Sequence, residues 1–189
     1  MKPVEVAFAE WRRLDCAGDE TCRLVYGSSG WMLMGHARFS DTHCPAALDY
    51  VVRCDKGWVT TSADISGLLG GETVGWHISR DTRGDWHMND EICPGLSDCQ
   101  DVDLGFSPAT NLLPLRRLDP APGMDTHVSA AWFHWPSARL ERLDQTYTRR
   151  ESRTVSYRSD GFAADLTVDD SGFVTHYPGF WEGEVRNAG

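Results

Sequence analysis

The sequence predicts a mostly β protein of antiparallel strands with one or two short helices, and three observations carry this prediction. Apolar residues recur at every second position along most of the chain, which is the period of a strand with one buried face. Short segments rich in Gly, Asp and Ser separate these runs, as hairpin turns do. Patterns with the 3.6-residue period of a helix are scarce.

In chain order, the first expected element is a helix over residues 5–14, "EVAFAEWRRL". Three hairpins follow, and their turns are "GSSG" at 27–30, "DKG" at 55–57 and "DTRG" at 81–84. In the second turn the glycine supplies the left-handed residue that a three-residue loop requires. The strands that flank these turns are expected at 22–26, 31–39, 48–54, 58–65, 73–80 and 85–88.

The last third of the chain has the same organisation. Segment 136–143, "PSARLERL", fits either a short helix or the start of a strand. Two further hairpins turn at "ES", residues 151–152, and at "DDSG", residues 169–172. The strands around these turns are expected at 144–150, 153–159, 162–168 and 173–178.

A faint internal repeat connects the two parts of the chain. The turn at 81–84 resembles the turn at 169–172, and the dipeptide Pro94–Gly95 recurs as Pro178–Gly179. A duplicated unit would explain both matches. Because Asp-x-x-Gly is a common hairpin turn, chance recurrence explains them as well.

We expect a single domain over 1–189, with two similar β halves at about 1–100 and 119–189 joined by a connector at 101–118. Two such halves would close on each other as a pseudo-two-fold barrel or half-barrel, which hides most strand edges. Antiparallel barrels of this size often enclose one apolar ligand. The fold alone therefore favours a binding protein.

Composition excludes several classes of partner. The formal charge of −10 disfavours nucleic acid and anionic membrane surfaces, since both need clustered Lys and Arg. No apolar run approaches the length of a membrane span, so we expect no stable membrane insertion. The first residues lack a secretion signal, and we expect a cytoplasmic protein whose six cysteines stay reduced. No metal or other cofactor is expected, and the sequence leaves the oligomeric state open.

The run "DVDLGFSPATNLLPLRRL" at 101–118 contains the most conspicuous polar pattern. Asp101 and Asp103 have the spacing that holds a divalent ion in sugar-nucleotide enzymes. Those sites accompany βαβ units, and the chain has no such rhythm. We therefore expect these acids to pair with Arg116 and Arg117 of the same run.

Seven blocks of the chain, in order, resemble the bacterial family described as putative glycolipid-binding, formerly a family of unknown function. The blocks are "WRRLDCAGDETCRL", "LDYVVRCDKGWVT", "DTRGDW", the run at 101–118, "AAWFHWP", "LDQTY" and "DDSGFVTHYPGFW". The resemblance implies a pseudo-two-fold antiparallel structure similar to the half-barrel lipoprotein carriers of the bacterial periplasm and to a mycobacterial lipid carrier. It also implies glycolipid binding. Those carriers are exported, whereas no signal peptide is recognised in this sequence.

We expect non-catalytic binding of an amphiphile, a glycolipid, in an apolar cavity with a polar mouth. The expected acyl-facing wall is Leu112, Leu113, Leu115, Trp76 and Ile78. The expected head-group end is Arg116, Arg117, Asn111, Trp132, Tyr147 and Tyr177. An arginine can fork onto a phosphate or carboxylate, but only one of two adjacent arginines on a strand can face inward.

Two other functions stay open. A small hydrolase or transferase acting on a lipid- or sugar-linked substrate could use Asp101, Asp103 or a histidine as its acid–base group. A pKa raised by burial in a cleft would favour that enzyme, and pairing of both aspartates with arginine would count against it. A protein-interaction module would instead use exposed sheet edges, and a closely packed interior would favour it.

Overall fold

The computed structural model describes residues 2–40 and 44–188, and these form one sheet with a short helix. The sheet has 15 strands in the order β8-β7-β6-β5-β4-β3-β2-β1-β15-β14-β13-β12-β11-β10-β9. The first strands are β1 (Val4–Arg13), β2 (Ala17–Tyr26), β3 (Trp31–Ser40), β4 (Pro45–Cys54), β5 (Thr60–Leu69), β6 (Glu72–Arg80), β7 (Trp86–Met88) and β8 (Glu91–Cys93). The others are β9 (Asp101–Leu104), β10 (Asp125–His134), β11 (Arg139–Glu151), β12 (Thr154–Ser159), β13 (Phe162–Val168), β14 (Val174–Tyr177) and β15 (Trp181–Asn187).

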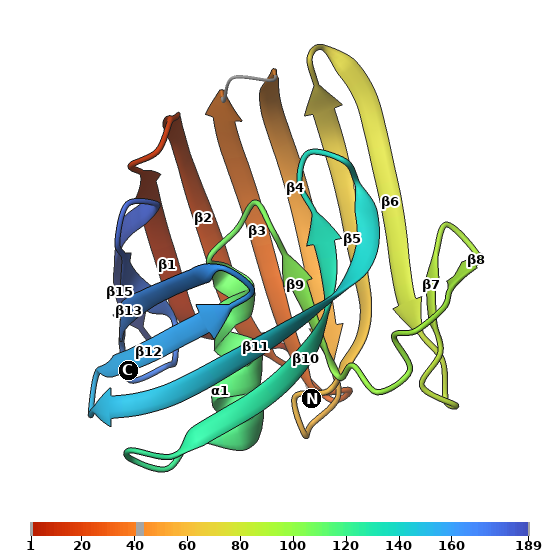
Figure 1. Ribbon diagram of the computed structural model, residues 1–189. Coiled ribbons are helices and arrows are strands. Elements are labelled where there is room, and N and C mark those ends of the chain that lie inside the picture. The colour runs from red at the N-terminus through yellow and green to blue at the C-terminus, as the bar shows by residue number, and fades with distance from the viewer. Residues whose placement is uncertain (1, 41–43, 189) are drawn as a thin grey trace.

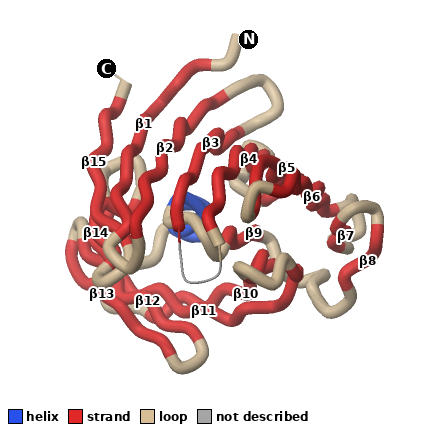
Figure 2. The backbone as a smooth tube through the Cα atoms, turned by 90° about the horizontal axis from the view of Figure 1, so that it is seen from above, coloured by secondary structure: helices blue, strands red, loops and turns tan. Residues whose placement is uncertain are grey.

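The sheet consists of two meanders that meet where β1 pairs with β15. Within each meander, strands adjacent in sequence are adjacent in the sheet. The β1–β15 register, from Ala7↔Asn187 to Arg13↔Trp181, places the two ends of the chain side by side (Figure 2). All strand pairs are antiparallel except β9–β10, in which Ala130 lies opposite Asp101. The connection between β9 and β10 is a crossover, and a crossover is what joins parallel neighbours.

The sheet curls around a central helix. Seen from above, α1 (Leu112–Leu118) lies inside the curve of the strands (Figure 2). From the side, the long strands β1–β6 stand behind α1, and β11 and β12 cross in front of it (Figure 1). In the described part of the chain the sheet stays open, with β8 and β9 as its edges. The predicted mostly β, antiparallel half-barrel is confirmed.

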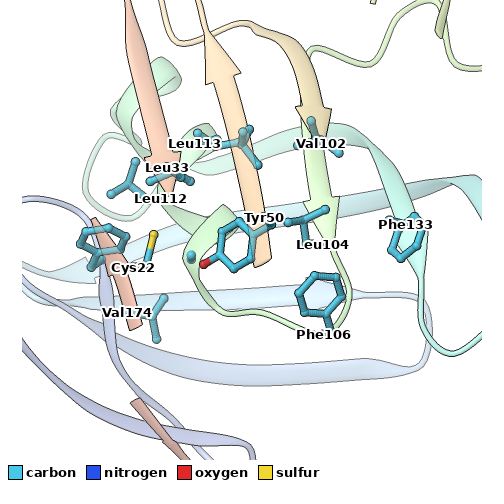
Figure 3. Close-up of a cluster of buried hydrophobic side chains, with 14 of the residues drawn as sticks. Cys22, Leu33, Tyr50, Val102, Leu104, Phe106, Leu112, Leu113, Phe133 and Val174 are labelled. Carbon is cyan, nitrogen blue, oxygen red and sulfur yellow. The ribbon is translucent and has the colours of Figure 1, made fainter. Parts of the chain in front are cut away.

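Alternation of buried and exposed side chains explains the long strands. In β4 every second residue is buried: Ala46, Leu48, Tyr50, Val52 and Cys54. These side chains belong to the same buried cluster as the leucines of α1. Figure 3 shows Tyr50 in this cluster, beside Leu104 and Phe106. A strand with one apolar face is stable in this position because that face is removed from water.

The predicted helix over 5–14 is wrong, because this segment is strand β1. Ala7, Ala9 and Trp11 are buried at a spacing of two, while Glu10 and Arg12 are exposed. Ala, Glu and Arg favour helices, but β1 pairs with β2 on one side and β15 on the other. Those two ladders and the buried face outweigh a weak local preference.

The five predicted hairpins are confirmed, but the left-handed residue of the turn at 55–57 is Trp58, at φ 71°, and not the predicted Gly57. At "GSSG" the N–H of Gly27 donates to the carbonyl of Gly30 over 2.8 Å. The two turns of the proposed repeat are alike, since Gly84 donates to Asp81 over 3.0 Å and Gly172 to Asp169 over 3.1 Å. The turn at Asp55 is built in the same way although the repeat does not include it. Turn geometry is therefore no mark of duplication, and the single domain of two similar halves stays a prediction.

The segment expected to be a connector, 101–118, contains β9, the 3-10 helix η1 (Ala109–Asn111) and α1. Its two arginines therefore lie on a helix, and the inference that they share a strand is wrong. Pro114 is tolerated because it falls in the first turn, where the N–H has no helical partner. Asp119 ends the helix in a left-handed conformation at φ 42°. Segment 136–143 is a turn followed by the start of β11, one of its two predicted forms.

The longest helix among the described residues is α1 with seven residues, and within that part of the chain no helix has the length and hydropathy needed to cross a bilayer.

Candidate functional site

A cleft of about 870 Å³ opens where the ends of several strands meet. Its walls come from the end of β1, from β9 and the loop after it, from β10 and β11, from the β12–β13 hairpin and from the β14–β15 turn. Its volume falls within the roughly 300–1,000 Å³ of typical small-molecule sites. Both meanders contribute to it, so the pairing of β1 with β15 is what assembles the cleft.

One side of the cleft is an aromatic wall, by which we mean Tyr157, Phe162, Tyr177, Phe180 and Trp181. Some of these rings meet edge to face and others are tilted; of the edge-to-face pairs, the ring centroids of Phe162 and Phe180 are 5.6 Å apart, and those of Tyr177 and Trp181 are 5.4 Å apart. Such pairs contribute beyond the area they bury. Gly179, which precedes Phe180 in the β14–β15 turn, has a φ of 79°, a conformation that residues with a Cβ rarely adopt.

The cleft also has a polar floor: Asp103, Asn111 and the hydroxyl of Tyr157 line it, and Gln145 and Tyr147 are hydrogen-bonded to them. The amide of Gln145 donates to Oδ2 of Asp103 over 2.6 Å and lies 3.2 Å from the Tyr157 hydroxyl. The Tyr147 hydroxyl donates to Oδ1 of Asn111 over 3.1 Å. Burial raises the pKa of Asp103 to about 6, helped by the nearby charge of Asp101 and opposed by the Gln145 hydrogen bond.

Arg13 stands at the rim of the cleft, at the end of β1. Its Nε and Nη2 donate to the two carboxylate oxygens of Asp15 over 3.0 and 2.8 Å, and Nη1 donates to the carbonyl of Phe106 over 3.3 Å. The guanidinium carbon lies 5.0 Å from the centroid of the Trp181 ring. This arginine thus has its forked donors occupied and its face covered.

Arg142 of β11 stands elsewhere on the rim and is equally engaged. Its Nη1 donates to both oxygens of Asp98 over 2.6 and 2.7 Å, and its Nε donates to Asp144 over 2.9 Å. Its Nη2 donates to the Ser129 hydroxyl over 2.6 Å. Both rim cations are therefore held by carboxylates of the chain itself.

Comparison with known proteins identifies the family. The model of the family described as "Putative glycolipid-binding" matches residues 9–183. The chain belongs to this family. A crystal structure of a DUF1089 family protein from Pseudomonas aeruginosa shares the fold, with a TM-score of 0.76 and 30% sequence identity over 86% of this chain and 90% of that one. A search of curated proteins finds no match.

In this family member, the predicted pairing of acids with arginines holds for one pair. Arg117 donates to both oxygens of Asp101 over 3.0 and 2.5 Å, and Asp101 is 1% exposed. Burial raises the pKa of Asp101 despite the opposing effect of Arg117. Asp103 bonds to Gln145 instead. Arg116 stacks over Trp58, 5.4 Å from the ring centroid.

The predicted ligand contacts fall into three groups. Those that line the cleft are Asn111, Trp132 and Tyr177, with Tyr147 bonded to Asn111 in its floor. Those buried in the core or packed on it are Leu112, Leu113, Leu115, Ile78 and Trp76. Those that lie away from the cleft wall, among the described residues, are Arg116 and Arg117. The leucines of α1 thus fill the inside of the half-barrel, and the cleft lies beside them.

A buried acid beneath the cleft, Glu20, was not predicted from the sequence. Glu20 of β2 is 2% exposed, and its Oε1 accepts hydrogen bonds from the hydroxyls of Tyr50 and Ser107 over 2.6 and 2.5 Å. Its Oε2 has no hydrogen-bond partner in the described structure. Burial raises the pKa of Glu20 to about 7, against the lowering effect of Ser107, Tyr50 and Arg13. Ser107 also lines the cleft and so connects it to this acid.

These missed residues come from separate parts of the sequence. Glu20 and Arg13 lie in the block "WRRLDCAGDETCRL", and Ser107 lies in the run at 101–118. Both blocks carried the family resemblance, but no local spacing connects them. A Cβ at Gly35 would lie 2.1 Å from the Tyr50 ring, so the glycine leaves the room that Tyr50 needs to reach Glu20. That requirement is invisible without the pairing of β3 with β4.

Proposed function

We propose that the chain binds an amphiphile, a glycolipid, in the cleft and leaves it chemically unchanged. The observation that carries this proposal is the combination of an aromatic wall and a polar floor within one cleft of about 870 Å³. Aromatic faces suit both acyl chains and the C–H faces of sugars, and the floor offers donors and acceptors to hydroxyl groups. The family description supports the same class of ligand.

The half-exposed rings are expected to contribute the contacts that a ligand would gain. Phe162 lies in the cleft wall, and Phe8 is equally half-buried but lies outside the cleft, under Arg23 and Arg186. The substitution Phe162→Ala should weaken glycolipid binding about five- to tenfold, the effect of losing roughly 1 kcal/mol of aromatic contact. Phe8→Ala is the matched control and should leave affinity unchanged.

The measurement is displacement of a fluorescent lipid, supported by native mass spectrometry of the protein purified from its own host. We expect a bound amphiphile in the mass spectrum and competition that depends on Phe162. Repeated preparations without a lipid, together with no displacement from the wild-type chain, would refute the proposal. Equal loss in both phenylalanine variants would place the binding site outside the cleft.

A second function is favoured by Asp103. Its pKa is raised to about 6 by burial at the cleft wall, the condition set above for an acid–base group. Asp101, by contrast, is occupied by Arg117. Incubating the protein with a defined glycolipid and analysing the lipid by mass spectrometry separates the two functions. Unchanged lipid is expected, whereas cleavage that Asp103→Asn abolishes would select the enzyme.

A further inference from the structure

We propose that the cleft selects an uncharged sugar head group and rejects head groups that carry phosphate or sulfate, with Asp103 as a specificity-determining residue. This inference rests on the proposed function and adds the charge class of the ligand. Three observations support it: the charges that line the cleft, the pairing of its two arginines with carboxylates of the chain, and a carboxylate oxygen of the cleft that accepts no hydrogen bond in the described structure.

Carboxylates outnumber cations around the cleft. Four aspartates line it, Asp15, Asp103, Asp144 and Asp160, against two arginines, Arg13 and Arg142. A ligand phosphate would enter a site of negative balance in a chain whose net charge is already −10. Like charges repel more strongly where water is partly excluded, so this balance disfavours an anion.

The two arginines offer an anion little in return. Arg13 donates to Asp15 from two nitrogens, and Nη1 of Arg142 donates to both carboxylate oxygens of Asp98. A phosphate would have to displace one of these carboxylates, leaving a new unpaired charge at the rim. A sugar hydroxyl can accept or donate at the edge of these pairs without breaking them.

The hydrogen-bonding capacity that remains unused in the described part of the cleft suits a ligand with hydroxyl groups. Asp103 uses Oδ2 for its bond to Gln145, and among the described residues no bond is made to its Oδ1, which can accept from a ligand hydroxyl. A ligand hydroxyl can donate to this oxygen, whereas a phosphate dianion and a quaternary ammonium have no hydrogen to donate.

Three octyl amphiphiles with the same tail test the inference: octyl glucoside, octyl phosphate and octyltrimethylammonium. Each is titrated calorimetrically into the full chain below its micelle concentration, at pH 8 and low salt. We expect octyl glucoside to bind at least tenfold more tightly than octyl phosphate, and more tightly than the ammonium. Equal or tighter binding of octyl phosphate, or tightest binding of the ammonium, would overturn the head-group inference while leaving amphiphile binding intact. If none of the three binds, the proposed function itself fails.

The second part of the experiment repeats these titrations with variants of Asp103 and of other aspartates. Asp103→Asn keeps an oxygen for Gln145 but removes the charge, so the preference for glucoside over phosphate should narrow roughly tenfold. Asp160→Asn, on the exposed β12–β13 hairpin, should narrow this preference less, and it replaces Asp103→Asn as the test if that variant does not fold. Asp170→Asn makes the same charge change away from the cleft wall and should leave the ratio as it is. An unchanged ratio in both cleft variants would overturn the role of these acids.

Discussion

Asp101 and Asp103 lie two residues apart on β9 and therefore share one face of the strand, yet they have different surroundings. Asp101 is enclosed and bonded through both oxygens to Arg117 of α1. Asp103 lines the cleft and is bonded through one oxygen to a neutral amide. The same Asp-x-Asp pattern thus contains one structural ion pair and one acid available to a ligand. The difference lies in what α1 brings to each carboxylate.

The ion pair ties α1 to the sheet. Arg117 lies in the last turn of the helix, where its positive charge also interacts favourably with the negative end of the helix dipole. Asp101 is held in register with Ala130 of β10, so the pair fixes the helix relative to the edge strand β9 and its neighbour β10. Asp103 is bonded through Oδ2 to Gln145 of β11, and among the described residues its Oδ1 accepts no hydrogen bond, so this oxygen is available to a ligand in the cleft.

Breaking the pair should produce the largest effect. Arg117→Met leaves Asp101 buried without a cation, and we expect a loss of about 3–5 kcal/mol in the free energy of unfolding. Urea denaturation followed by circular dichroism measures it. Arg153→Met removes the same charge from the pair with Asp170, whose side chains are 62% and 78% exposed, and should cost less than about 1 kcal/mol. Similar losses in both variants would contradict the structural role of Asp101.

The fold was predictable because period-two alternation is a local property. The strands flanking the turns at 27–30, 55–57 and 169–172 follow from it directly. β1 was misread because its Ala, Glu and Arg residues favour a helix, and only its two neighbours in the sheet determine its state. The helix at 112–118 was missed for the opposite reason, since Pro114 and a short leucine run give no helical period.

The candidate site was predictable only in part. Trp132, Tyr177 and Asn111 were identified because aromatic and amide groups stand out in the sequence. Arg116 and Arg117 stand out as strongly but face other parts of the fold. The position of the rim arginines and of the acid beneath the cleft was not predictable, because distant parts of the chain surround them: 93 residues separate Arg13 from Phe106, and 87 separate Glu20 from Ser107.

Glu20 is a third buried carboxylate, whose hydrogen-bond donors are two hydroxyls; among the described residues, no cation is bonded to it. Its pKa is about 7 when folded against an ordinary 4.5, so the folded chain holds a proton that the unfolded chain releases. Stability should therefore fall as the pH rises from about 4.5 to 7, by on the order of 3 kcal/mol from this group.

The substitution Glu20→Gln removes that titration while keeping an oxygen for Tyr50 and Ser107. Relative to wild type, the variant should gain stability between about pH 4.5 and pH 7 in urea denaturation, and the difference should level off above pH 7. Glu182→Gln, on an exposed pair with Arg12, is the matched control and should follow the wild-type curve. If the difference in the free energy of unfolding between wild type and Glu20→Gln stayed constant with pH, burial without a bonded cation would not raise the pKa of a carboxyl group. The contrast between Asp101 and Asp103 would then lose its electrostatic basis.

The smallest expected effect is the coupling between the two aspartates themselves. The charge of Asp101 is one of the causes that raise the pKa of Asp103, after burial. Asp101→Asn should therefore lower the pKa of Asp103 from about 6, but burial should keep it above the ordinary 3.8. Carbon-detected NMR of the aspartate carboxyl groups follows this titration residue by residue, and Asp170→Asn supplies the control for an equal change in net charge. If the pKa of Asp103 stays at about 6 in the Asp101 variant, burial alone sets it, and the two acids act independently despite sharing a strand face.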